Sequence, residues 1–418
     1  MVSWKIRKGE LVTNMRKRHR IGLAGIAVFA LIVAAAPSIG SVVLPKNAGG
    51  LPTGTIWLAL VAFGLSASLT PAAAWLAQRL GAIDVPGGRK IHQSPTPLLG
   101  GAAIYAGFIS VVLARPSWPT ELWGVVLGAS IIFTLGLLED TKGVPASARL
   151  FLQIAAVLVV IQSGVVLTFL PATWWGVCGE WLLTLLWIVG ITNAFNFLDG
   201  LDGLATGSAA INAFFLGGAA LVTAQPNLAV LCFALMAAAI GFLPYNYKPH
   251  RRDASGEIFL GDSGSTFLGF TLACLAINGD WAEGSPKDLI VPVLIMAVPI
   301  FDMTLITVMR VREGLVRNLT EWIVYTGRDH FHHRLLGLGM RKKETVAIIY
   351  LVNFCLGISA SLLKGSGTVD AFLVLGQVTI IFGIIGYAMV VMRKRVPRSP
   401  SVQPEAREIV YHEQADRK

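Results

Sequence analysis

Charged residues are scarce in this 418-residue chain: Asp, Glu, Lys and Arg make up 14% of it, whereas hydrophobic residues make up 54%. In a soluble domain about a quarter of the residues are charged. The mean hydropathy is +0.66, and apolar residues recur in blocks of about 17 to 25, long enough to span a bilayer as helices. The shortage of charge argues against a soluble globular protein and predicts an all-α polytopic membrane protein.

Other features are missing as well. The four cysteines (Cys178, Cys232, Cys274 and Cys355) are far apart and include no CxxC, which favours small packing residues over a disulfide or metal framework. No loop is long enough to fold as a separate domain, and no internal repeat is evident, which argues against an inverted-repeat transporter. No small-residue cleavage site follows the basic N-terminus, so we expect the first apolar block to be retained as a span.

About 11 or 12 membrane spans are expected. They cover residues 21–44, 54–77, 99–114, 119–138, 149–170, 181–198, 204–223, 228–243, 263–279, 288–309, 345–363 and 370–392. We expect residues 1–20 to form a basic cytoplasmic arm, residues 21–392 a single transmembrane domain, which is the candidate catalytic domain, and residues 393–418 a polar, basic cytoplasmic tail.

Basic residues orient these spans. With the N-terminus in the cytoplasm, every Lys and Arg falls in a cytoplasmic segment except Lys46, Arg115, Lys287 and Lys364. Such an asymmetry is typical of the positive-inside rule. The net charge of +10 therefore needs no nucleic-acid partner. All the polar motifs lie on the cytoplasmic side, so we expect the active face there.

Two cytoplasmic motifs precede the fifth expected span. The first, residues 84–97, carries Arg89, Lys90 and His92 among turn residues and either binds phosphate or is an ordinary positive-inside loop. The second is the adjacent pair Glu139-Asp140 at a membrane boundary. Neighbouring acids repel each other, so the pair either shares a cation or is a solvated helix end; Arg149 could balance one charge.

The segment NAFNFLDGLDG, residues 193–203, is the most informative. If the helix continues, Asn193, Asn196, Asp199 and Asp202 recur every three residues and form one polar stripe that emerges from the bilayer. Acids and carboxamides without a basic neighbour are costly at such a depth. The stripe therefore predicts a bound cation and a polar substrate.

Two further motifs complete the cytoplasmic face. IFLGDSGST, residues 258–266, opens a span with glycines and hydroxyls, so its backbone N–H groups are expected to be free for anions, with Asp262 holding a cation. Phe259 either stacks on a base or anchors the surface. GRDHFHHRL, residues 327–335, concentrates His and Arg; it predicts a phosphate- and sugar-binding loop, with zinc or a solvated basic face as alternatives. Asp302 either lines the same cleft or is satisfied locally.

Acids, a hard cation and basic donors on one membrane face are the equipment of phosphoryl transfer. These motifs, in this order, resemble the polyprenyl-phosphate N-acetylhexosamine-1-phosphate transferase family over about residues 80–340. The resemblance implies transfer of a sugar-1-phosphate, GlcNAc-1-phosphate in first place, from a UDP-sugar to undecaprenyl phosphate. UMP is released, and lipid-linked polysaccharide synthesis begins. It also implies a multi-pass protein of the bacterial cytoplasmic membrane, with Mg²⁺ as cofactor and Mn²⁺ as a substitute.

The same resemblance assigns roles by matching motifs. The catalytic residues are Glu139, Asp140 and Asp262, and the metal ligands are Asp262 and Asp140. The substrate-binding residues are Lys90, Asn193, Asn196, Asp199, Asp202, Phe259, Arg328, His330, His332, His333 and Arg334.

Some alternatives stay open at this point. The acidic pair of the family is usually Asp-Asp, whereas here it begins with Glu139, which leaves a catalytically silent scaffold as one alternative. The loop DHFHHRL is closer to the N-acetylglucosamine branch than to the phospho-N-acetylmuramoyl-pentapeptide branch, which is the enzymatic alternative. A lipid or sugar-phosphate transporter is the non-enzymatic one. A GxxxG at Gly124 and Gly128 is compatible with packing within the chain or in a homodimer.

Overall fold

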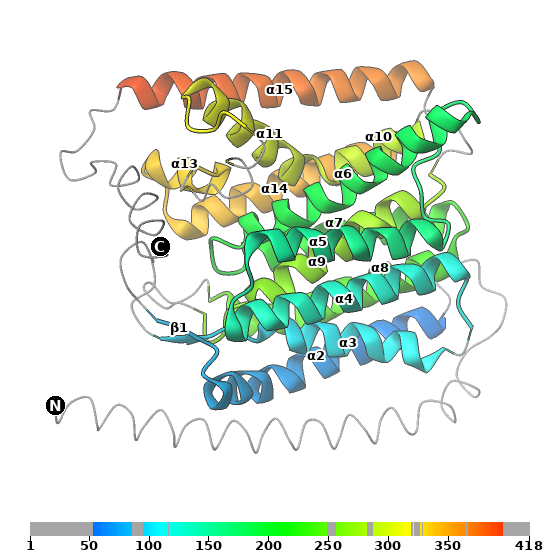
Figure 1. The fold of residues 1–418 in the computed structure, drawn as a ribbon, viewed down its shortest axis with the longest axis vertical. Helices are drawn as coiled ribbons and strands as arrows, with labels where there is room; N and C mark the ends of the chain where they lie inside the picture. The colour runs from blue at the N-terminus through cyan, green and yellow to red at the C-terminus, as the bar shows by residue number, and fades with distance from the viewer. Residues whose placement is uncertain are drawn as a thin grey trace, which may run out of the picture. The chain divides into compact units, whose positions relative to one another are not determined.

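The computed structural model describes residues 53–85, 95–115, 117–248, 256–281, 287–318, 321, 327, 329–363 and 367–395. Within these residues the regular secondary structure is helical apart from one two-stranded antiparallel ribbon (Figure 1). Seven helices are long and apolar enough to cross a membrane, or eight if one bent pair counts as a single span. The predicted all-α polytopic membrane class is confirmed.

The elements are numbered in chain order. They are α2 (Thr53–Leu80), β1 (Ile83–Asp84), β2 (Thr96–Pro97), α3 (Gly100–Ala114), α4 (Thr120–Lys142), α5 (Ala146–Gln162), α6 (Trp174–Leu198), α7 (Leu204–Val222), α8 (Pro226–Asn246), α9 (Gly261–Asn278), α10 (Lys287–Ile295), α11 (Ala297–Arg312), α13 (Phe331–Gly337), α14 (Lys342–Leu362) and α15 (Thr368–Arg395).

Expected spans that fall on described residues coincide with helices, and two of them need correction. The span expected at 149–170 ends at Gln162, because Gly164 adopts a left-handed φ of +100° that stops the helix. The span expected at 288–309 is two helices, α10 and α11, bent by 76°. Pro299 lies in the first turn of α11, where its missing N–H is tolerated. The span expected at 21–44 lies outside the described residues.

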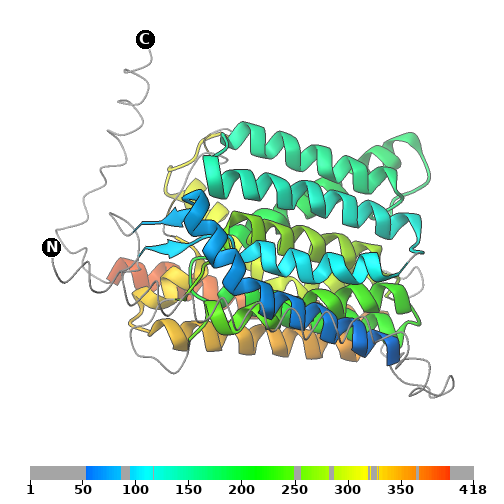
Figure 2. The same cartoon turned by 90° about the horizontal axis from the view of Figure 1, so that it is seen from below.

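Helix α9 is the core of the bundle and packs against α3, α4, α6 and α7. Its apolar side chains point in all directions and are buried, among them Phe267, Phe270 and Leu272, as expected for a helix enclosed by others. Figure 2 shows the helices side by side from a second direction. At the start of α9 the backbones touch: a Cβ on Gly101 of α3 would meet the backbone of Gly264, and one on Gly136 of α4 would meet that of Ser263.

The β1–β2 ribbon connects this core to the first polar motif. Ile83 pairs with Pro97 and Asp84 with Thr96. The carbonyl of Pro97 accepts a hydrogen bond from the N–H of Phe259 (2.8 Å), and the N–H of Gly100 donates to the Phe259 carbonyl (3.0 Å). The ribbon and α3 therefore hold the segment that leads into α9.

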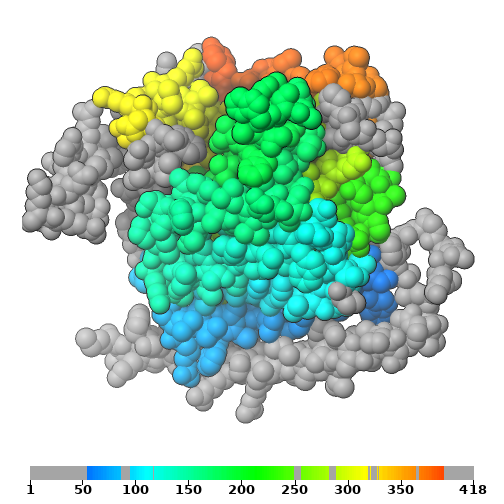
Figure 3. All heavy atoms as spheres, turned by 45° about the vertical axis from the view of Figure 1, so that its right-hand side comes forward, coloured from blue at the N-terminus to red at the C-terminus, as the bar shows by residue number. Residues whose placement is uncertain are grey.

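Two compact units divide the chain, at Leu375. The first contains α2 to α14, and on one of its faces α3 to α6 form a continuous surface, cyan to green in Figure 3. Large apolar side chains on α5 and α6 are exposed, including Phe151 and Leu186, as expected where a bundle faces lipid. The second unit includes residues 376–395 of α15, where Ile380, Ile384 and Tyr387 are exposed.

Candidate active site

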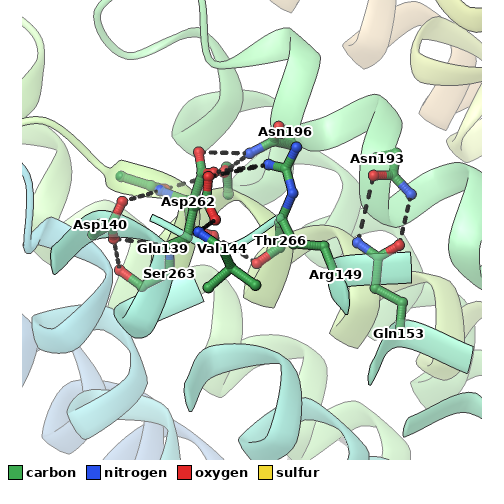
Figure 4. Close-up of polar contacts among 12 residues, drawn as sticks. Glu139, Asp140, Val144, Arg149, Gln153, Asn193, Asn196, Asp262, Ser263 and Thr266 are labelled. Carbon is green, nitrogen blue, oxygen red and sulfur yellow. Dashed lines mark hydrogen bonds and ion pairs between the residues drawn. The ribbon is translucent and has the colours of Figure 1, made fainter. Parts of the chain in front are cut away.

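Five carboxylates gather where four helix ends meet: the ends of α4 and α6 and the starts of α5 and α9. We call this group, with the one arginine that pairs with it, the acidic cluster; it consists of Glu139, Asp140, Arg149, Asp199, Asp202 and Asp262. Figure 4 shows three of the carboxylates, those of Glu139, Asp140 and Asp262. The structure therefore brings together acids as far apart as Asp140 and Asp262, which are 122 positions apart along the chain. The predicted grouping of Glu139, Asp140 and Asp262 is reproduced in this geometry.

Asp140 caps α9 from a different helix. One carboxylate oxygen accepts the N–H of Asp262 (2.7 Å), and the other accepts the N–H (3.0 Å) and hydroxyl (2.6 Å) of Ser263. Gly261, with φ +76°, makes room for this carboxylate, because a Cβ there would lie 2.6 Å from Asp140 Oδ2. The prediction that the N–H groups at this helix start are free for anions is wrong for these two. A helix dipole and its first N–H groups attract a carboxylate, and the protein supplies its own.

Asp262 lies in the first turn of α9, with its carboxylate held from the side by α6. Asn196 donates its amide to Asp262 Oδ1 (2.9 Å) and to the hydroxyl of Ser265 (3.0 Å). The second oxygen, Oδ2, lies 3.6 Å from Arg149. One oxygen of Asp262 is thus fixed by a neutral donor and the other faces a loosely paired cation.

Arg149 of α5 is a site residue that sequence reasoning noted as a counter-charge but did not assign to the site. Its guanidinium lies 3.4 Å from Glu139 Oε1 and 3.6 Å from Asp262 Oδ2. Glu139 is further held by the N–H of Val144 (2.6 Å). Among the residues that the structure describes, Arg149 is the one basic side chain seen in an ion pair with these carboxylates. The available signal was its position one turn into an apolar helix that follows the acidic pair.

The predicted polar stripe is only partly formed. Helix α6 ends at Leu198, with Asp199 as its C-cap, so the helical spacing stops before Asp202. Asn193 turns towards α5 and exchanges amide hydrogen bonds with Gln153 (3.0 and 3.4 Å), a partner that the sequence did not single out. Asp202 lies in the following turn, where it accepts the N–H of Gly256 (3.1 Å). Gly203, with φ +83°, redirects the chain there because glycine tolerates this conformation.

Asp199 is the least compensated acid of the acidic cluster. No hydrogen bond or ion pair joins its carboxylate to another described residue, and it follows the last residue of α6. Burial, and then the nearby carboxylate of Asp262 and those of two further aspartates, raise the pKa of Asp199 well above its usual range. A group in this position gains from any cation that approaches it.

The histidine loop is anchored by two carboxylates, each of which is held through both of its oxygens. We call its members and their anchors the histidine cluster; they are Asp302, Arg310, Asp329, His330, His332, His333 and Arg334. Asp302 of α11 is fully buried and accepts the N–H of Phe331 (2.5 Å), and its other oxygen lies 2.8 Å from His330 Nδ1. Asp302 is therefore satisfied locally and also supports the loop.

A second anchor stands beside it. Arg310 donates to both oxygens of Asp329 (2.7 and 2.8 Å), and Arg334 donates to the Asp329 carbonyl (2.7 Å). Burial alone would raise the pKa of Asp329, but the hydrogen bonds and charge of Arg310 lower it overall. Arg310 was not singled out from the sequence; like Asp302, it lies on the helix preceding the loop.

His332 is completely buried, and neither ring nitrogen has a hydrogen-bond partner among the residues that the structure describes. Its ring is stacked with His330 (6.0 Å between centroids) and tilted against His333 (4.2 Å). Burial, followed by the charge of His333, lowers the pKa of His332 to about 3, so the imidazole is neutral at physiological pH. It abuts Gly200, where a Cβ would collide with Nε2. The histidine loop therefore touches the turn between Asp199 and Asp202.

Three remaining predictions concern positions that the contacts constrain less. Phe259 is half-buried, with its backbone fixed as described above, so a stacking role remains a prediction. Lys90 and Arg328 lie outside the described residues, and their substrate-binding roles also remain predictions.

The chemistry of the acidic cluster fits a hard divalent cation. Among the described residues there is no ready-made set of three metal-binding side chains. Mg²⁺, however, is usually held by one or two carboxylates together with substrate phosphates and water. The Oδ2 atom of Asp262 and the carboxylate of Asp199 are suitable oxygen donors, whereas both oxygens of Asp140 are engaged in capping α9.

Comparison with known proteins identifies the family of the chain. The sequence profile of glycosyl transferase family 4 matches residues 122–280, the stretch from α4 to just beyond α9. A Bacillus subtilis protein named "Probable undecaprenyl-phosphate N-acetylglucosaminyl 1-phosphate transferase" is 34% identical over 320 residues, which cover 75% of this chain and 86% of that protein. A decaprenyl-phosphate N-acetylglucosaminephosphotransferase of Mycolicibacterium smegmatis is 35% identical over 338 residues, or 70% of this chain and 79% of that protein.

A more distant relative has the same kind of name. The undecaprenyl-phosphate alpha-N-acetylglucosaminyl 1-phosphate transferase of Escherichia coli K12 is 27% identical over 320 residues, or 75% of this chain and 85% of that protein. The similarity thus includes the acidic cluster and extends over most of the bundle. The chain is a multi-pass membrane protein and belongs to glycosyl transferase family 4, the polyprenyl-phosphate sugar-1-phosphate transferases that its motifs resemble.

Proposed function

We propose that the protein transfers GlcNAc-1-phosphate from UDP-GlcNAc to undecaprenyl phosphate on the cytoplasmic face of a bacterial membrane. One observation carries this proposal: several buried or half-buried carboxylates converge at the end of a membrane helix bundle with a single described counter-cation, Arg149. Such a surplus of negative charge suits a metal-bound pyrophosphate. The printed names of the relatives indicate the lipid phosphate and the sugar.

The reaction exchanges one phosphoanhydride for another. An oxygen of the lipid phosphate attacks the β-phosphorus of the UDP-sugar, and the bond from that phosphorus to the oxygen bridging to the α-phosphate breaks. UMP leaves with that oxygen, and the sugar stays bonded to its own phosphate through C1. Catalysis therefore depends on in-line positioning and on neutralising the negative charge of the transferred phosphoryl group.

The residues divide this work. Asp262 and Asp199 would hold Mg²⁺, which when bound supplies charge neutralisation to the pyrophosphate. Asp140 fixes the start of α9 and so the direction of Asp262, and Asn196 fixes one of its oxygens. Glu139, held by Val144 and Arg149, borders the same space.

We assign the donor side to the turn after α6 and to the histidine loop. His332 reaches the turn at Gly200, which places a neutral imidazole beside the segment that carries Asp199 and Asp202. Its two ring nitrogens are buried and have no hydrogen-bond partner among the described residues, so a hydroxyl or phosphate of the donor reaches them only if the loop moves on binding; one nitrogen would then donate and the other accept. His330, His333, Arg334 and Phe259 complete this side, as the motif resemblance implies.

The test is transfer of label from UDP-[¹⁴C]GlcNAc to undecaprenyl phosphate by purified protein in detergent, with Mg²⁺, with Mn²⁺ or with chelator. We expect labelled lipid and an equal amount of UMP, both only when metal is present. A panel of other UDP-N-acetylhexosamines and UDP-MurNAc-pentapeptide separates GlcNAc transfer from its enzymatic alternatives. Absence of product with every donor would contradict the proposal.

A further inference from the structure

Arg149 holds its two carboxylates loosely. Its guanidinium lies 3.4 Å from Glu139 and 3.6 Å from Asp262, and its side chain is 38% exposed. Figure 4 shows it reaching across to both acids from α5. Arg310 differs: it donates hydrogen bonds of 2.7 and 2.8 Å to the two carboxylate oxygens of Asp329, and its side chain is 2% exposed. An exposed, monodentate ion pair is weak, whereas a buried, bidentate ion pair is not easily broken.

The oxygen that Arg149 approaches is also the one that a metal ion would need. Asp262 Oδ1 is occupied by Asn196, and Oδ2 faces Arg149. Both oxygens of Asp140 are bound to the start of α9. A divalent cation that binds Asp262 through Oδ2 competes with the guanidinium for this oxygen, and the positive charge of Arg149 opposes a cation beside Asp262.

We propose that Arg149 is an exchangeable internal cation. Without metal it pairs with Glu139 and Asp262; when a divalent cation binds Asp262, Arg149 releases this carboxylate and pairs with a phosphate of a bound substrate. Its planar, permanently charged guanidinium suits a phosphate, and its exposed side chain leaves it free to turn. The inference rests on the proposed function only for its second step, since the competition with metal needs no substrate.

The first experiment measures metal binding without substrate. Mn²⁺ is titrated into the detergent-solubilised protein, and free Mn²⁺ is followed by electron paramagnetic resonance. We expect Arg149→Gln to bind Mn²⁺ about 3- to 5-fold more tightly than the wild type, the range set by the strength of an exposed ion pair. Arg149→Lys keeps a competing charge and should bind within about twofold of the wild type.

Lys142 provides the matched control. It is exposed near the same helix end, two residues from Asp140, and the structure gives it no ion pair with a described residue. Lys142→Gln removes the same charge without opening the Arg149 pair, so it reports the general effect of a lost positive charge. Tighter binding in Arg149→Gln than in Lys142→Gln supports competition. Equal or weaker binding in Arg149→Gln overturns the proposal.

The second experiment measures transfer kinetics at saturating Mg²⁺. We expect Arg149→Gln to lower kcat/KM by about 10-fold or more through loss of a charged phosphate contact, and Arg149→Lys to restore part of it. A raised KM for undecaprenyl phosphate would identify the lipid phosphate as the new partner, and a raised KM for the UDP-sugar would identify the pyrophosphate. Unchanged kcat/KM for both substrates overturns the exchange. If the wild type transfers nothing, the proposed function fails while the Mn²⁺ result still decides the competition.

Discussion

The acidic cluster and the histidine cluster differ in how fully their carboxylates are paired within the protein. In the histidine cluster each carboxylate has a dedicated partner: Asp302 is bound to His330 and Phe331, and Asp329 to Arg310. In the acidic cluster Glu139 and Asp262 share Arg149, and the carboxylate of Asp199 has no hydrogen-bond or ion-pair partner among the described residues. Internally balanced charge fixes a loop in place, whereas unbalanced charge is available to a ligand. The difference suggests that the histidine cluster is preformed and the acidic cluster is completed by metal and substrate.

The largest effect is expected for Asp262→Asn, which tests whether the acidic cluster, and not the histidine cluster, holds the metal needed for turnover. Asp262→Asn removes the charge that directs a metal to the start of α9, so transfer should fall by about 10³-fold or more. Turnover is measured at limiting and at saturating Mg²⁺. Asp280→Asn, an exposed acid just beyond the other end of the same helix, serves as the control and should behave like the wild type. Normal turnover of Asp262→Asn at limiting Mg²⁺ would contradict the assignment.

The next prediction concerns Asp302, the buried hydrogen-bond acceptor of the histidine cluster. Asp302→Ala leaves His330 Nδ1 and the N–H of Phe331 without their buried acceptor, which should cost about 2 to 5 kcal/mol of folding stability. Asp302→Asn keeps one acceptor and should lose less. Thermal unfolding in detergent ranks the variants. If Asp302→Ala unfolds at the wild-type temperature, the anchor is not what holds the loop.

A substitution at the contact between the two clusters should have a smaller effect. Gly200→Ala pushes against His332 Nε2, so the KM for the UDP-sugar should rise by about 10-fold, close to the effect of losing one neutral hydrogen bond. In His332→Ala the obstacle is gone, so adding Gly200→Ala should change little. Additive effects in the double variant would show that the two residues act independently.

The pH dependence of stability sharpens the contrast further. Folding raises the pKa of Asp199 above the value of about 4 that it has in the unfolded chain. Without metal, the folded protein therefore loses stability as the pH rises from about 4 towards the pKa of Asp199 in the folded state. Asp199→Asn avoids that cost. It should therefore melt at a higher temperature than the wild type at neutral pH and lose activity, with the stability difference shrinking as the pH falls towards about 4. A variant that is less stable at every pH would contradict the unbalanced state of Asp199.

The smallest effect is expected at the neutral contact beside the acidic cluster. Gln153→Ala and Asn193→Ala each remove a side-chain hydrogen-bonded pair between α5 and α6, a contact worth about 0.6 kcal/mol in membrane proteins. Each variant should lose less than about threefold in turnover. The double variant should be no worse than either single one, as a shared contact requires. A large loss at Gln153 alone would assign it a role beyond this pair.

Much of this arrangement was accessible from sequence because its signals are local. Apolar blocks located the helices, and the motifs around Glu139, Asn193, Asp262 and His330 marked the segments that meet. The contacts between segments were not accessible. Nothing in the sequence says that Asp140 caps a helix 122 residues away, that Asn193 turns to Gln153, or that Arg149 reaches Asp262. The bend between α10 and α11 and the end of α6 before Asp199 depend on backbone conformation, which apolar periodicity does not report.

The glycines around the start of α9 have a consequence for evolution and for engineering. Gly101, Gly136 and Gly261 carry no functional group, yet a single added methyl at any of them would displace the backbone or the cap that aims Asp262. Substitutions at these positions change the distance between the neighbouring backbones and leave every functional group in place. Activity lost there measures geometry alone, so a graded series of substitutions at the three glycines would show how many tenths of an ångström the reaction tolerates without altering any chemical group.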